Sequence, residues 1–388
     1  MKNSTIRVAV IQRICTHYRR PLFQALSQEI SLDVSLLTSD PTLPKGEQSA
    51  PFHWKNFNTM ATKFSLGAKS YNIPFSLSLL NEVWYGGYDV VIAEGVTNIV
   101  HDSLLYPICK AKRIPFIWWD AGRRRNAQRN IFRRMADPLV DSITRGADAC
   151  IAYGSVARDY MISSGAQKEK IFVANNTINI KNILQNIAED KKDAEQIRQQ
   201  MNLSGGIILY VGVIEKRKKL ENLIEAFQRL KQSYTQPVSL IIVGDGPYLQ
   251  PIVSWTKSGG YEQDIHFLGR IVDGVGAYFA MCDLFVLPSE GGLALNQAMA
   301  YAKPLIATSA DGTEVDLISD GWNGFIVEED NIGALSAAME QVLSDRDEQQ
   351  RMGANSLQRI SEEFTLQRMV IQFQHAISSA LDGKSSYY

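Results

Sequence analysis

The sequence predicts an α/β protein with two consecutive domains, each built on a doubly wound, mostly parallel sheet. Short apolar runs of strand length recur along the chain, and amphipathic stretches of helical length separate them. This alternation is typical of β-α-β units. It stops once, at residues 175–205, where the chain is polar and rich in Asn, Gln and Lys, and then it restarts. We therefore expect a first domain at residues 1–178 and a second at residues 179–364.

Continuous apolar runs such as IRVAVI and GIILYV indicate strands that are buried on both faces of a sheet. Residues 38–69 contain three prolines and little periodicity, which indicates a loop-rich segment. The last helix, residues 365–385, is expected to pack back on the first domain. The expected strands are residues 6–11, 32–37, 88–93, 115–119, 149–153, 171–174, 206–211, 238–243, 265–268, 284–287, 305–307 and 324–327.

The composition excludes several classes of protein. With 388 residues, 45% of them hydrophobic, the chain is long enough to bury a large core. A formal net charge of −1 argues against binding nucleic acid over a large surface. No apolar run approaches the roughly 20 residues of a spanning helix, so we expect a cytoplasmic protein. The cysteines and histidines are scattered without metal-ligand spacing, and we expect no metal site.

Residues 286–308 (VLPSEGGLALNQAMAYAKPLIAT) are the clearest candidate for a ligand site. An apolar strand, a turn with Gly291 and Gly292, and a helix with Leu293 and Ala302 on its apolar side follow one another. The first N–H groups of a helix bind anions and glycine allows close approach, so this turn is a candidate diphosphate site. An ordinary β-α turn has the same pattern, and the spacing alone does not separate the two.

A run of four cations, residues 216–219 (KRKK), follows the strand at residues 206–211. Four positive charges at a helix start oppose the helix dipole, which favours an anionic partner for them. The alternative is a solvated helix start. If the run binds an anion, Lys218 is the first candidate.

Four motifs occur in order, each at the end of an expected strand: YVGVIEKRKKLENLIEAF, LIIVGDGP, IHFLGR and DLFVLPSEGGLALNQAMAYAKPLIAT. Together they resemble the nucleotide-sugar-binding half of a group 1 glycosyltransferase, a retaining enzyme of GT-B fold. The resemblance is strong over residues 206–330 and looser in the first half, through HYRRPLF and FVANNTI. It implies two Rossmann-like domains that face each other across a cleft.

The resemblance implies the roles of particular residues in the second domain. Lys218 falls on the family's diphosphate lysine, whereas Val213 replaces the usual arginine and leaves Arg217 as its substitute. The family's two motif glutamates fall on Ser289 and Gln297, and Glu290 stands one position late. Lys218, Arg217 and Glu290 are therefore the catalytic candidates. The donor-binding candidates are Gly212, Lys218, Gly244, Asp245, Arg270, Ser289, Gly291, Gly292, Leu293 and Gln297.

The family mechanism implies no cofactor and no metal, because the nucleotide sugar is itself a substrate. The sugar is transferred with the leaving phosphate on the same face as the acceptor hydroxyl. The protein then supplies geometry and stabilises the charge on the departing diphosphate.

The acceptor side is expected in the first domain. His17, Asp120 and Arg123 follow expected strands and are the acceptor-side candidates. Arginines mixed with apolar residues at 123–134 form a basic amphipathic segment suited to anionic lipid headgroups or a lipid diphosphate. A nucleic-acid patch or an ordinary charged surface helix would look similar. We favour peripheral contact with the inner face of the membrane and no nucleic acid.

The expected function is transfer of a hexose from a nucleotide-diphosphate sugar to a glycan or lipid-linked glycan, with retention of configuration. The expected setting is synthesis of a cell-surface polysaccharide, such as lipopolysaccharide, exopolysaccharide or capsule. Two alternatives stay open: a sugar-nucleotide epimerase or phosphorylase of the same fold, and a non-catalytic homologue that binds nucleotide or glycan. A dinucleotide oxidoreductase is disfavoured, since no GxGxxG follows any expected strand.

Overall fold

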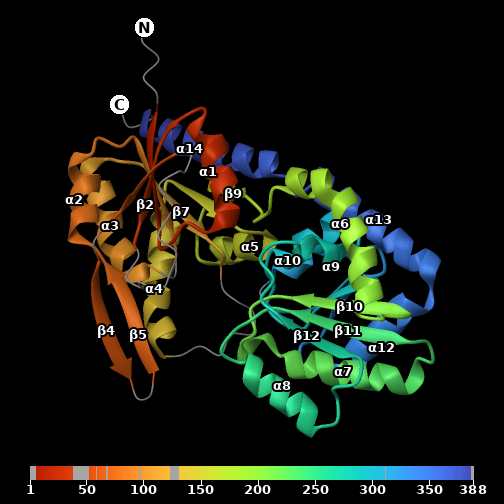
Figure 1. Ribbon diagram of the computed structural model, residues 1–388. Coiled ribbons are helices and arrows are strands. Elements are labelled where there is room, and N and C mark those ends of the chain that lie inside the picture. Colours follow the sequence, from red (N-terminus) through yellow and green to blue (C-terminus); the bar gives the residue numbers. More distant parts are fainter. Residues whose placement is uncertain are drawn as a thin grey trace. The chain divides into compact units, whose positions relative to one another are not determined.

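The computed structural model describes residues 6–37, 52–57, 59–66, 69–95, 98–122, 131–310 and 312–385. These residues form two compact units (Figure 1). Unit 1 contains the chain up to Asn176 together with the stretch from Leu366 onward. Unit 2 contains Thr177–Thr365.

Unit 1 is built on a seven-stranded sheet in which every neighbouring pair is parallel. Its strand order is β3-β2-β1-β6-β7-β8-β9, so the order reverses at β1, which lies between β2 and β6. Ligands of doubly wound sheets bind beyond the carboxyl ends of the strands at such a reversal. The strands are β1 (Arg7–Gln12), β2 (Ser31–Leu36), β3 (His53–Asn56), β6 (Val90–Glu94), β7 (Phe116–Asp120), β8 (Ala149–Ala152) and β9 (Ile171–Val173).

Helices cover both faces of this sheet, because successive residues of a strand point to opposite faces. Val8 packs with α1 and α14, whereas its neighbour Ala9 packs with α2, α3, α4 and α5. Phe373 of α14 meets Trp119 of β7 edge to face, with ring centroids 4.9 Å apart. The helices are α1 (Arg20–Ser27), α2 (Leu77–Tyr85), α3 (Ile99–Lys112), α4 (Ile131–Gly146), α5 (Ser155–Ser163) and α14 (Leu366–Ser385), with 3-10 turns η1 (His17–Arg19) and η2 (Lys168–Lys170).

The prediction of a loop-rich segment at residues 38–69 is wrong for part of its length. β3 lies in it, and β4 (Met60–Leu66) pairs with β5 (Lys69–Phe75) in an antiparallel hairpin. β3 is an edge strand whose side chains are exposed or half-buried, so its sequence, HWKN, lacks the apolar run on which the strand predictions depended.

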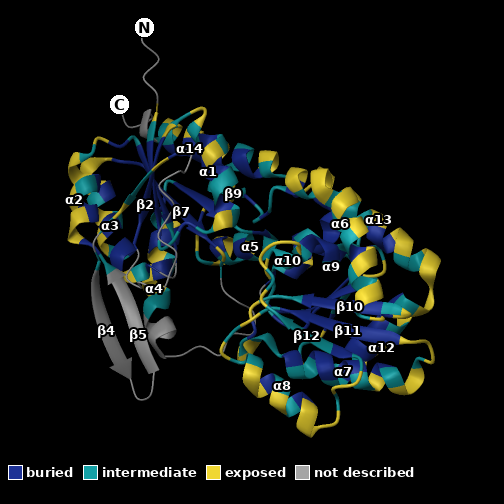
Figure 2. Ribbon diagram, viewed as in Figure 1, coloured by how far each residue is buried: buried dark blue, intermediate teal, exposed yellow. Residues whose placement is uncertain are grey.

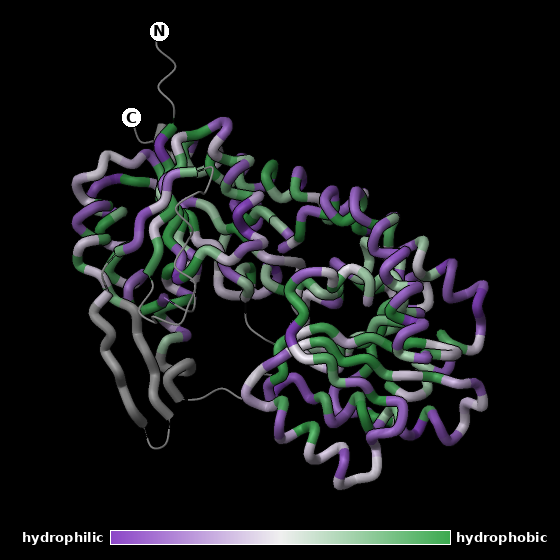
Figure 3. The backbone as a smooth tube through the Cα atoms, in the orientation of Figure 1, coloured by the Kyte–Doolittle hydropathy of each residue, from purple (hydrophilic) through white to green (hydrophobic). Residues whose placement is uncertain are grey.

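Unit 2 has a six-stranded parallel sheet of order β12-β11-β10-β13-β14-β15, which reverses at β10. Its strands are buried (Figure 2) and hydrophobic (Figure 3), and they share one continuous core with the helices. The strands are β10 (Gly206–Val211), β11 (Val238–Val243), β12 (Ile265–Gly269), β13 (Leu284–Leu287), β14 (Leu305–Thr308) and β15 (Gly324–Val327). The helices are α6 (Ile180–Gln200), α7 (Leu220–Ser233), α8 (Leu249–Ser258), α9 (Val275–Met281), α10 (Ala294–Ala300), α11 (Thr313–Leu317), α12 (Ile332–Ser344) and α13 (Arg346–Glu362), with the 3-10 turn η3 (Lys216–Lys218). The predicted fold class, two doubly wound parallel α/β sheets, is confirmed.

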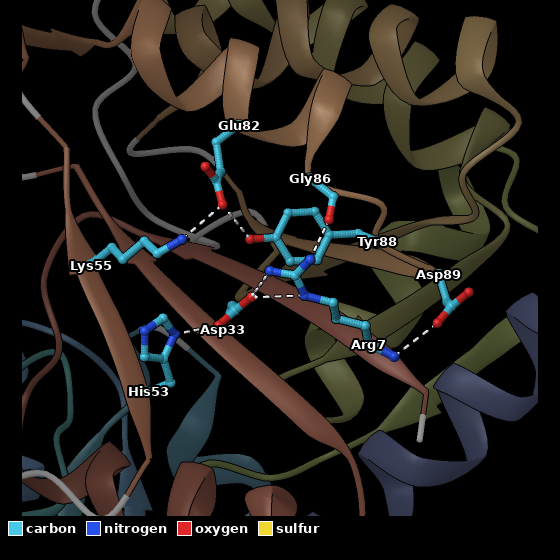
Figure 4. A network of polar contacts seen from close by, with 8 residues as sticks. All are labelled: Arg7, Asp33, His53, Lys55, Glu82, Gly86, Tyr88 and Asp89. Atoms are coloured by element: carbon cyan, nitrogen blue, oxygen red, sulfur yellow. Dashed lines mark hydrogen bonds and ion pairs between the residues drawn. The ribbon is translucent and has the colours of Figure 1, made fainter. Parts of the chain in front are cut away.

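A network of polar contacts ties the edge strand β3 to the rest of unit 1 (Figure 4). The Asp33 carboxylate on β2 is only 6% exposed and accepts hydrogen bonds from the Arg7 guanidinium at 2.8 and 3.2 Å. It also contacts Nδ1 of His53 on β3. Lys55 Nζ, on the same strand, lies 2.8 Å from Glu82 Oε1 on α2. Among the described strands, β3 pairs with β2 alone. The contacts of His53 and Lys55 therefore provide its further attachment to unit 1.

Replacing Asp33 by asparagine should destabilise the protein at neutral pH and much less in acid. Burial raises the pKa of the Asp33 carboxyl, but hydrogen bonds from His53 and Arg7 outweigh burial and hold that pKa below 3.8. A lowered carboxyl pKa stabilises the folded state above the unfolded-state pKa, and this is lost as the pH falls through the folded-state pKa. Asp33→Asn should lower the free energy of unfolding by about 2 kcal/mol at neutral pH.

Urea unfolding of Asp33→Asn from neutral pH down to about pH 3.5 checks this window. The difference from the unaltered protein should shrink below about pH 5. Asp159→Asn is the control, because the Asp159 side chain is 65% exposed and its loss should cost less than about 0.5 kcal/mol. A difference for Asp33→Asn that stays constant over this range would show that the charge of Asp33 is not what stabilises β3.

Candidate functional site

In unit 2, the loop after β10 forms backbone hydrogen bonds with the end of β11 and the loop that follows it. Ile214 N donates to Asp245 O at 2.9 Å, and Gly212 N donates to Val243 O at 3.0 Å. A Cβ atom on Gly244 would lie 1.9 Å from Gly212 O, and the φ of Gly244 is +156°. Only glycine fits there. The donor-binding candidates Gly212, Gly244 and Asp245 therefore lie side by side at this edge of the sheet.

The three catalytic candidates lie together beyond the neighbouring strands β10 and β13. Lys218 Nζ, on η3, donates to Glu290 O at 2.9 Å across 72 positions of sequence. The Arg217 guanidinium forms an ion pair with the Glu290 carboxylate and another with Glu215. The Glu290 side chain is only 11% exposed, so it is not a solvated loop carboxylate. Since Arg217 has two carboxylate partners, it brings no surplus positive charge, and Lys218 is the stronger candidate for the diphosphate.

The other two cations of the KRKK run have different surroundings. Lys219 adopts a left-handed backbone conformation at the start of α7, with a φ of +50°. Its ammonium lies 2.7 Å from the Asp330 carboxylate and 3.0 Å from Glu329. Lys216 is exposed. The run is therefore divided, and only Arg217 and Lys218 contact Glu290.

The turn after β13 contains buried polar atoms that lack a partner among the described residues. Ser289 is 2% exposed, and its Oγ has no hydrogen-bond partner. Thr308 ends the adjacent strand β14, is equally buried, and has an Oγ1 without a partner. No heavy atom lies within 4 Å of the position that a Cβ on Gly292 would take. Open space beside unsatisfied hydroxyls is what a bound polar ligand would fill.

The helix that follows this turn is shorter than the sequence predicted. It begins at Ala294, with Leu293 as its N-cap, and ends at Ala300. Ala302 was expected on the apolar side of this helix but lies beyond it, in a left-handed conformation with a φ of +54°. Seven residues make about two helical turns. If the turn binds an anion, the side chains around it are therefore expected to matter more than this short helix.

The remaining donor-binding candidates lie at the same edge of the sheet and differ in exposure. Asp245 is exposed, and its Oδ1 accepts a hydrogen bond from Gly246 N at 2.7 Å. Arg270 follows β12 and is also exposed. Gln297 on α10 and Gly291 in the turn are half-buried. All of them can be reached by a ligand that lies beyond the carboxyl ends of β10 to β14.

In unit 1, the carboxyl edge of the sheet holds a network that the sequence analysis missed. Glu94 ends β6, and its Oε1 lies 2.5 Å from Arg19 Nη1 and accepts from Tyr153 OH at 2.6 Å. Gln12, at the end of β1, donates to Glu94 Oε2 at 3.1 Å. Arg19 also contacts Tyr153 OH and lies over the Trp119 ring, 4.3 Å from its centroid. The rule that carboxyl ends of parallel strands meet at one edge was the available signal, because each of these residues ends or follows a strand.

Asp120 ends β7 at the same edge and is 3% exposed. Burial raises the pKa of its carboxyl to about 7, against hydrogen bonds from the backbone N–H groups of Ala121 and Gly122. The charge of Glu94 raises this pKa further. Oδ2 of Asp120 has no hydrogen-bond partner among the described residues. A carboxyl group with these properties accepts or donates a proton near neutral pH.

The other two acceptor-side candidates are not in this network. His17 begins η1 and is exposed, packing edge to face on Tyr18. It is Arg19, from the same short turn, that is directed to Glu94. Arg123 lies outside the described residues, as does most of the basic segment at 123–134.

Asp120→Asn should flatten the pH dependence of stability between about pH 4 and pH 7. The Asp120 pKa is raised above its ordinary value of 3.8, so the folded state binds this proton more tightly than the unfolded state. Stability therefore falls as the pH rises through that window, by up to about 1.4 kcal/mol per pH unit for one proton. The amide resembles the protonated acid, so the variant should be the more stable protein at pH 8.

Chemical unfolding at intervals between pH 4.5 and 8 measures this slope. Asp102, whose carboxyl pKa burial raises to about 6, contributes a slope of the same sign that remains in the variant. Asp159→Asn should leave the slope unchanged, since that side chain is exposed. An Asp120→Asn variant that is less stable than the unaltered protein at pH 8 would rule out a protonated Asp120.

Comparison with known proteins agrees with this geometry. The family model described as "Glycosyl transferases group 1" matches residues 190–359, which include the loops after β10, β11 and β13. This segment belongs to the group 1 glycosyltransferase family. An N-acetyl-alpha-D-glucosaminyl L-malate synthase of Bacillus anthracis is 28% identical over 47% of this chain and 49% of its own length. The N-acetylgalactosamine-N,N'-diacetylbacillosaminyl-diphospho-undecaprenol 4-alpha-N-acetylgalactosaminyltransferase of Campylobacter jejuni is 25% identical over 50% of this chain and 56% of its own length. The matches thus span about half the length of these curated relatives.

Solved glycosyltransferase structures match over nearly the whole chain. The structure of Anabaena HepE in complex with UDP has a TM-score of 0.76 and 19% identity, covering 96% of this chain and 100% of that one. The lipopolysaccharide outer core galactosyltransferase WaaB has a TM-score of 0.66 and 16% identity, covering 96% and 99%. At these identities the likeness establishes a GT-B-like fold and no more.

The described residues hold neither a group of metal ligands nor a bilayer-spanning helix. They contain no group of three or more His, Cys, Asp or Glu side chains placed to hold a metal ion. A bilayer-spanning helix would need more length and more apolar residues than any helix in the described part of the chain has.

Proposed function

We propose that this protein is a retaining glycosyltransferase that moves a hexose from a nucleotide-diphosphate sugar to a glycan or lipid-linked glycan. The contact between Lys218 Nζ and Glu290 O carries the proposal, because it brings the diphosphate lysine of the KRKK run to the sugar loop after β13. The proposed setting is synthesis of a cell-surface polysaccharide. The O-antigen chain mannosyltransferase C of Escherichia coli, 27% identical over 46% of this chain and 47% of its own length, supports this setting.

On the donor side, Lys218 binds the diphosphate and stabilises the charge that develops as the bond from sugar C1 to the phosphate oxygen breaks. The acceptor hydroxyl forms its new bond to C1 on the same face, and its proton passes to the departing phosphate oxygen. We assign Ser289 Oγ and Gln297 to hydrogen bonds with hydroxyls of the donor; the buried, unpartnered Ser289 Oγ supports this assignment. Arg217 holds the Glu290 carboxylate, and so keeps the loop in position.

On the acceptor side, Asp120 lies at the carboxyl edge of unit 1, where a hydroxyl of the acceptor would be bound. His17 and Arg123 remain proposed contacts at the rim of that site. The enzyme works in the cytoplasm, with the basic segment at 123–134 against the anionic inner face of the membrane. The sequence of that segment supports this part of the proposal.

Thermal-shift measurements with UDP-, GDP- and dTDP-sugars test the donor assignment. A nucleotide sugar at one hundred times its Kd stabilises the fold by about 2.7 kcal/mol, so the preferred donor should raise Tm clearly above the others. Product analysis of the selected donor then separates three outcomes. A new glycoside supports transfer, an epimerised nucleotide sugar indicates the epimerase alternative, and binding without turnover indicates a non-catalytic homologue. No shift with any nucleotide sugar would overturn the proposed function.

A further inference from the structure

The carboxyl edge of the unit 1 sheet carries a compact set of polar side chains, here called the Glu94 cluster. It draws on the ends of β1, β6 and β7, on the residue after β8, on η1 and on the first turn of α3. Asn98, which precedes α3, donates from Nδ2 to Glu94 O at 3.5 Å, and this places the start of α3 beside Glu94. The members are Gln12, Arg19, Glu94, Asn98, His101, Asp102, Asp120 and Tyr153.

The cluster has polar atoms that no described residue satisfies. The atoms left for a ligand are Gln12 Oε1, Arg19 Nε, Asn98 Oδ1, His101 Nε2, Asp102 Oδ2 and Asp120 Oδ2. His101 Nδ1 and Asp102 Oδ1 face each other at 3.6 Å. The six residues that carry the unpartnered atoms are at most 6% exposed. Buried polar atoms normally have partners, because leaving them unpaired costs free energy. A group of buried polar atoms without partners therefore indicates a site that a polar ligand completes. These atoms come from two strand ends, a 3-10 turn and a helix start.

The charges in the cluster are already balanced. Arg19 is committed to Glu94 and Tyr153, as described above. His101 Nδ1 lies 3.6 Å from Asp102 Oδ1, so these two form a second, self-contained pair. Asp120 adds at most one negative charge. The described residues of the cluster therefore leave no cation over for a phosphate or carboxylate, and burying such an anion beside Asp120 would be unfavourable.

The unpaired atoms instead match hydroxyl groups. Amide and carboxylate oxygens accept hydrogen bonds from hydroxyls, and the imidazole either accepts from or donates to them. A sugar ring presents several hydroxyls that both donate and accept, on a frame without charge.

We propose that the Glu94 cluster binds the terminal sugar of the acceptor as an uncharged polyol, and that it excludes acceptor ends bearing a phosphate or carboxylate group. This inference rests on the proposed transferase function and specifies the substrate class of its acceptor site. A charged lipid carrier is compatible with it, provided that the charge lies away from the sugar that receives the new bond.

Acceptor-dependent release of nucleoside diphosphate tests the inference with the full-length chain and the donor selected by thermal shift. The probes are octyl glycosides of glucose, galactose, mannose, N-acetylglucosamine and N-acetylgalactosamine, each paired with its uronic acid or 6-phosphate counterpart. At least one uncharged glycoside should accelerate release tenfold or more over water, and its charged counterpart should stay at the water rate. Preferential use of a charged member, or background rates with every uncharged glycoside, would overturn the inference.

Two variants connect the effect to the cluster. Gln12→Met keeps the length of the side chain and removes its polar atoms, and Asp102→Asn removes a charge with little change of shape. Each should raise KM for the uncharged acceptor about tenfold while the donor-induced rise in Tm stays unchanged. An unchanged acceptor KM in both variants would contradict the inference even though transfer itself persists. Loss of the donor-induced Tm shift in the unaltered protein would instead refute the proposed function, so the two failures are distinguishable.

Discussion

Lys218→Ala is expected to lower kcat/KM for sugar transfer by about 10²- to 10³-fold. The Lys218 ammonium is held beside the sugar loop by its hydrogen bond to Glu290 O. In our proposal, negative charge grows beside this ammonium as the diphosphate departs. An interaction that strengthens as the transition state forms affects kcat as well as KM. Initial rates of nucleoside diphosphate release, with a saturating acceptor, measure both constants.

Lys216→Ala is the matched control, because Lys216 shares the same 3-10 turn but is exposed. It should change kcat/KM less than about twofold, since a solvated cation has little differential interaction with the transition state. Arg217→Ala should have an intermediate effect, because its charge is already balanced by Glu215 and Glu290. Activity in Lys218→Ala close to that of Lys216→Ala would mean that the diphosphate is bound elsewhere.

Gly244→Ala is expected to destabilise unit 2 by about 2–3 kcal/mol and to abolish the donor-induced rise in Tm. The added Cβ would lie 1.9 Å from Gly212 O, and the φ of +156° is one that alanine rarely adopts. Both obstacles involve backbone, so no side chain can rotate to relieve them. The loops after β10 and β11 must separate, and the distance between Gly212 and Asp245 then changes. Urea unfolding and nucleotide thermal shifts measure the two consequences.

Gly292→Ala provides the contrast for this prediction. A Cβ at Gly292 would meet no heavy atom within 4 Å, so the free energy of unfolding should change by less than about 0.5 kcal/mol. The methyl group would nonetheless occupy space beside Ser289 that we assign to the donor, and KM for the donor should rise. Equal stability of the two alanine variants would show that the loop contact at Gly244 is not required for folding.

Much of the architecture was predictable because buried parallel strands are nearly pure apolar runs. The proximity of Lys218 and Glu290 was also within reach, since both follow strands of one sheet and carboxyl ends of parallel strands share an edge. Which side chains among Arg217, Lys218 and Glu290 form ion pairs or hydrogen bonds with one another was not predictable. Whether Arg217 faces a ligand or a carboxylate depends on side-chain geometry that no sequence spacing encodes. The edge strand β3 was missed for the opposite reason, because its side chains are partly exposed and its identity comes from tertiary contacts to Asp33 and α2.

The cluster around Glu94 shows a further limit. Its members come from six separate elements between Gln12 and Tyr153, and only Arg19 belongs to a motif that the sequence analysis singled out. Each is individually unremarkable, and only the fold brings them together. A buried Asp120 with a raised pKa likewise results from the packing of the surrounding chain.

The return of α14 to unit 1 has a consequence for biosynthesis. Its side chains Met369, Val370, Phe373 and Ile377 complete one of the two cores of that unit, against strands made from the first 173 residues. The ribosome therefore synthesises the whole continuous segment Thr177–Thr365 before α14, the last part of unit 1, is available. Unit 2 can therefore fold first, while the apolar face around Trp119 stays exposed until α14 has been synthesised. Chaperone dependence during translation should accordingly fall on the half of the protein that is synthesised first.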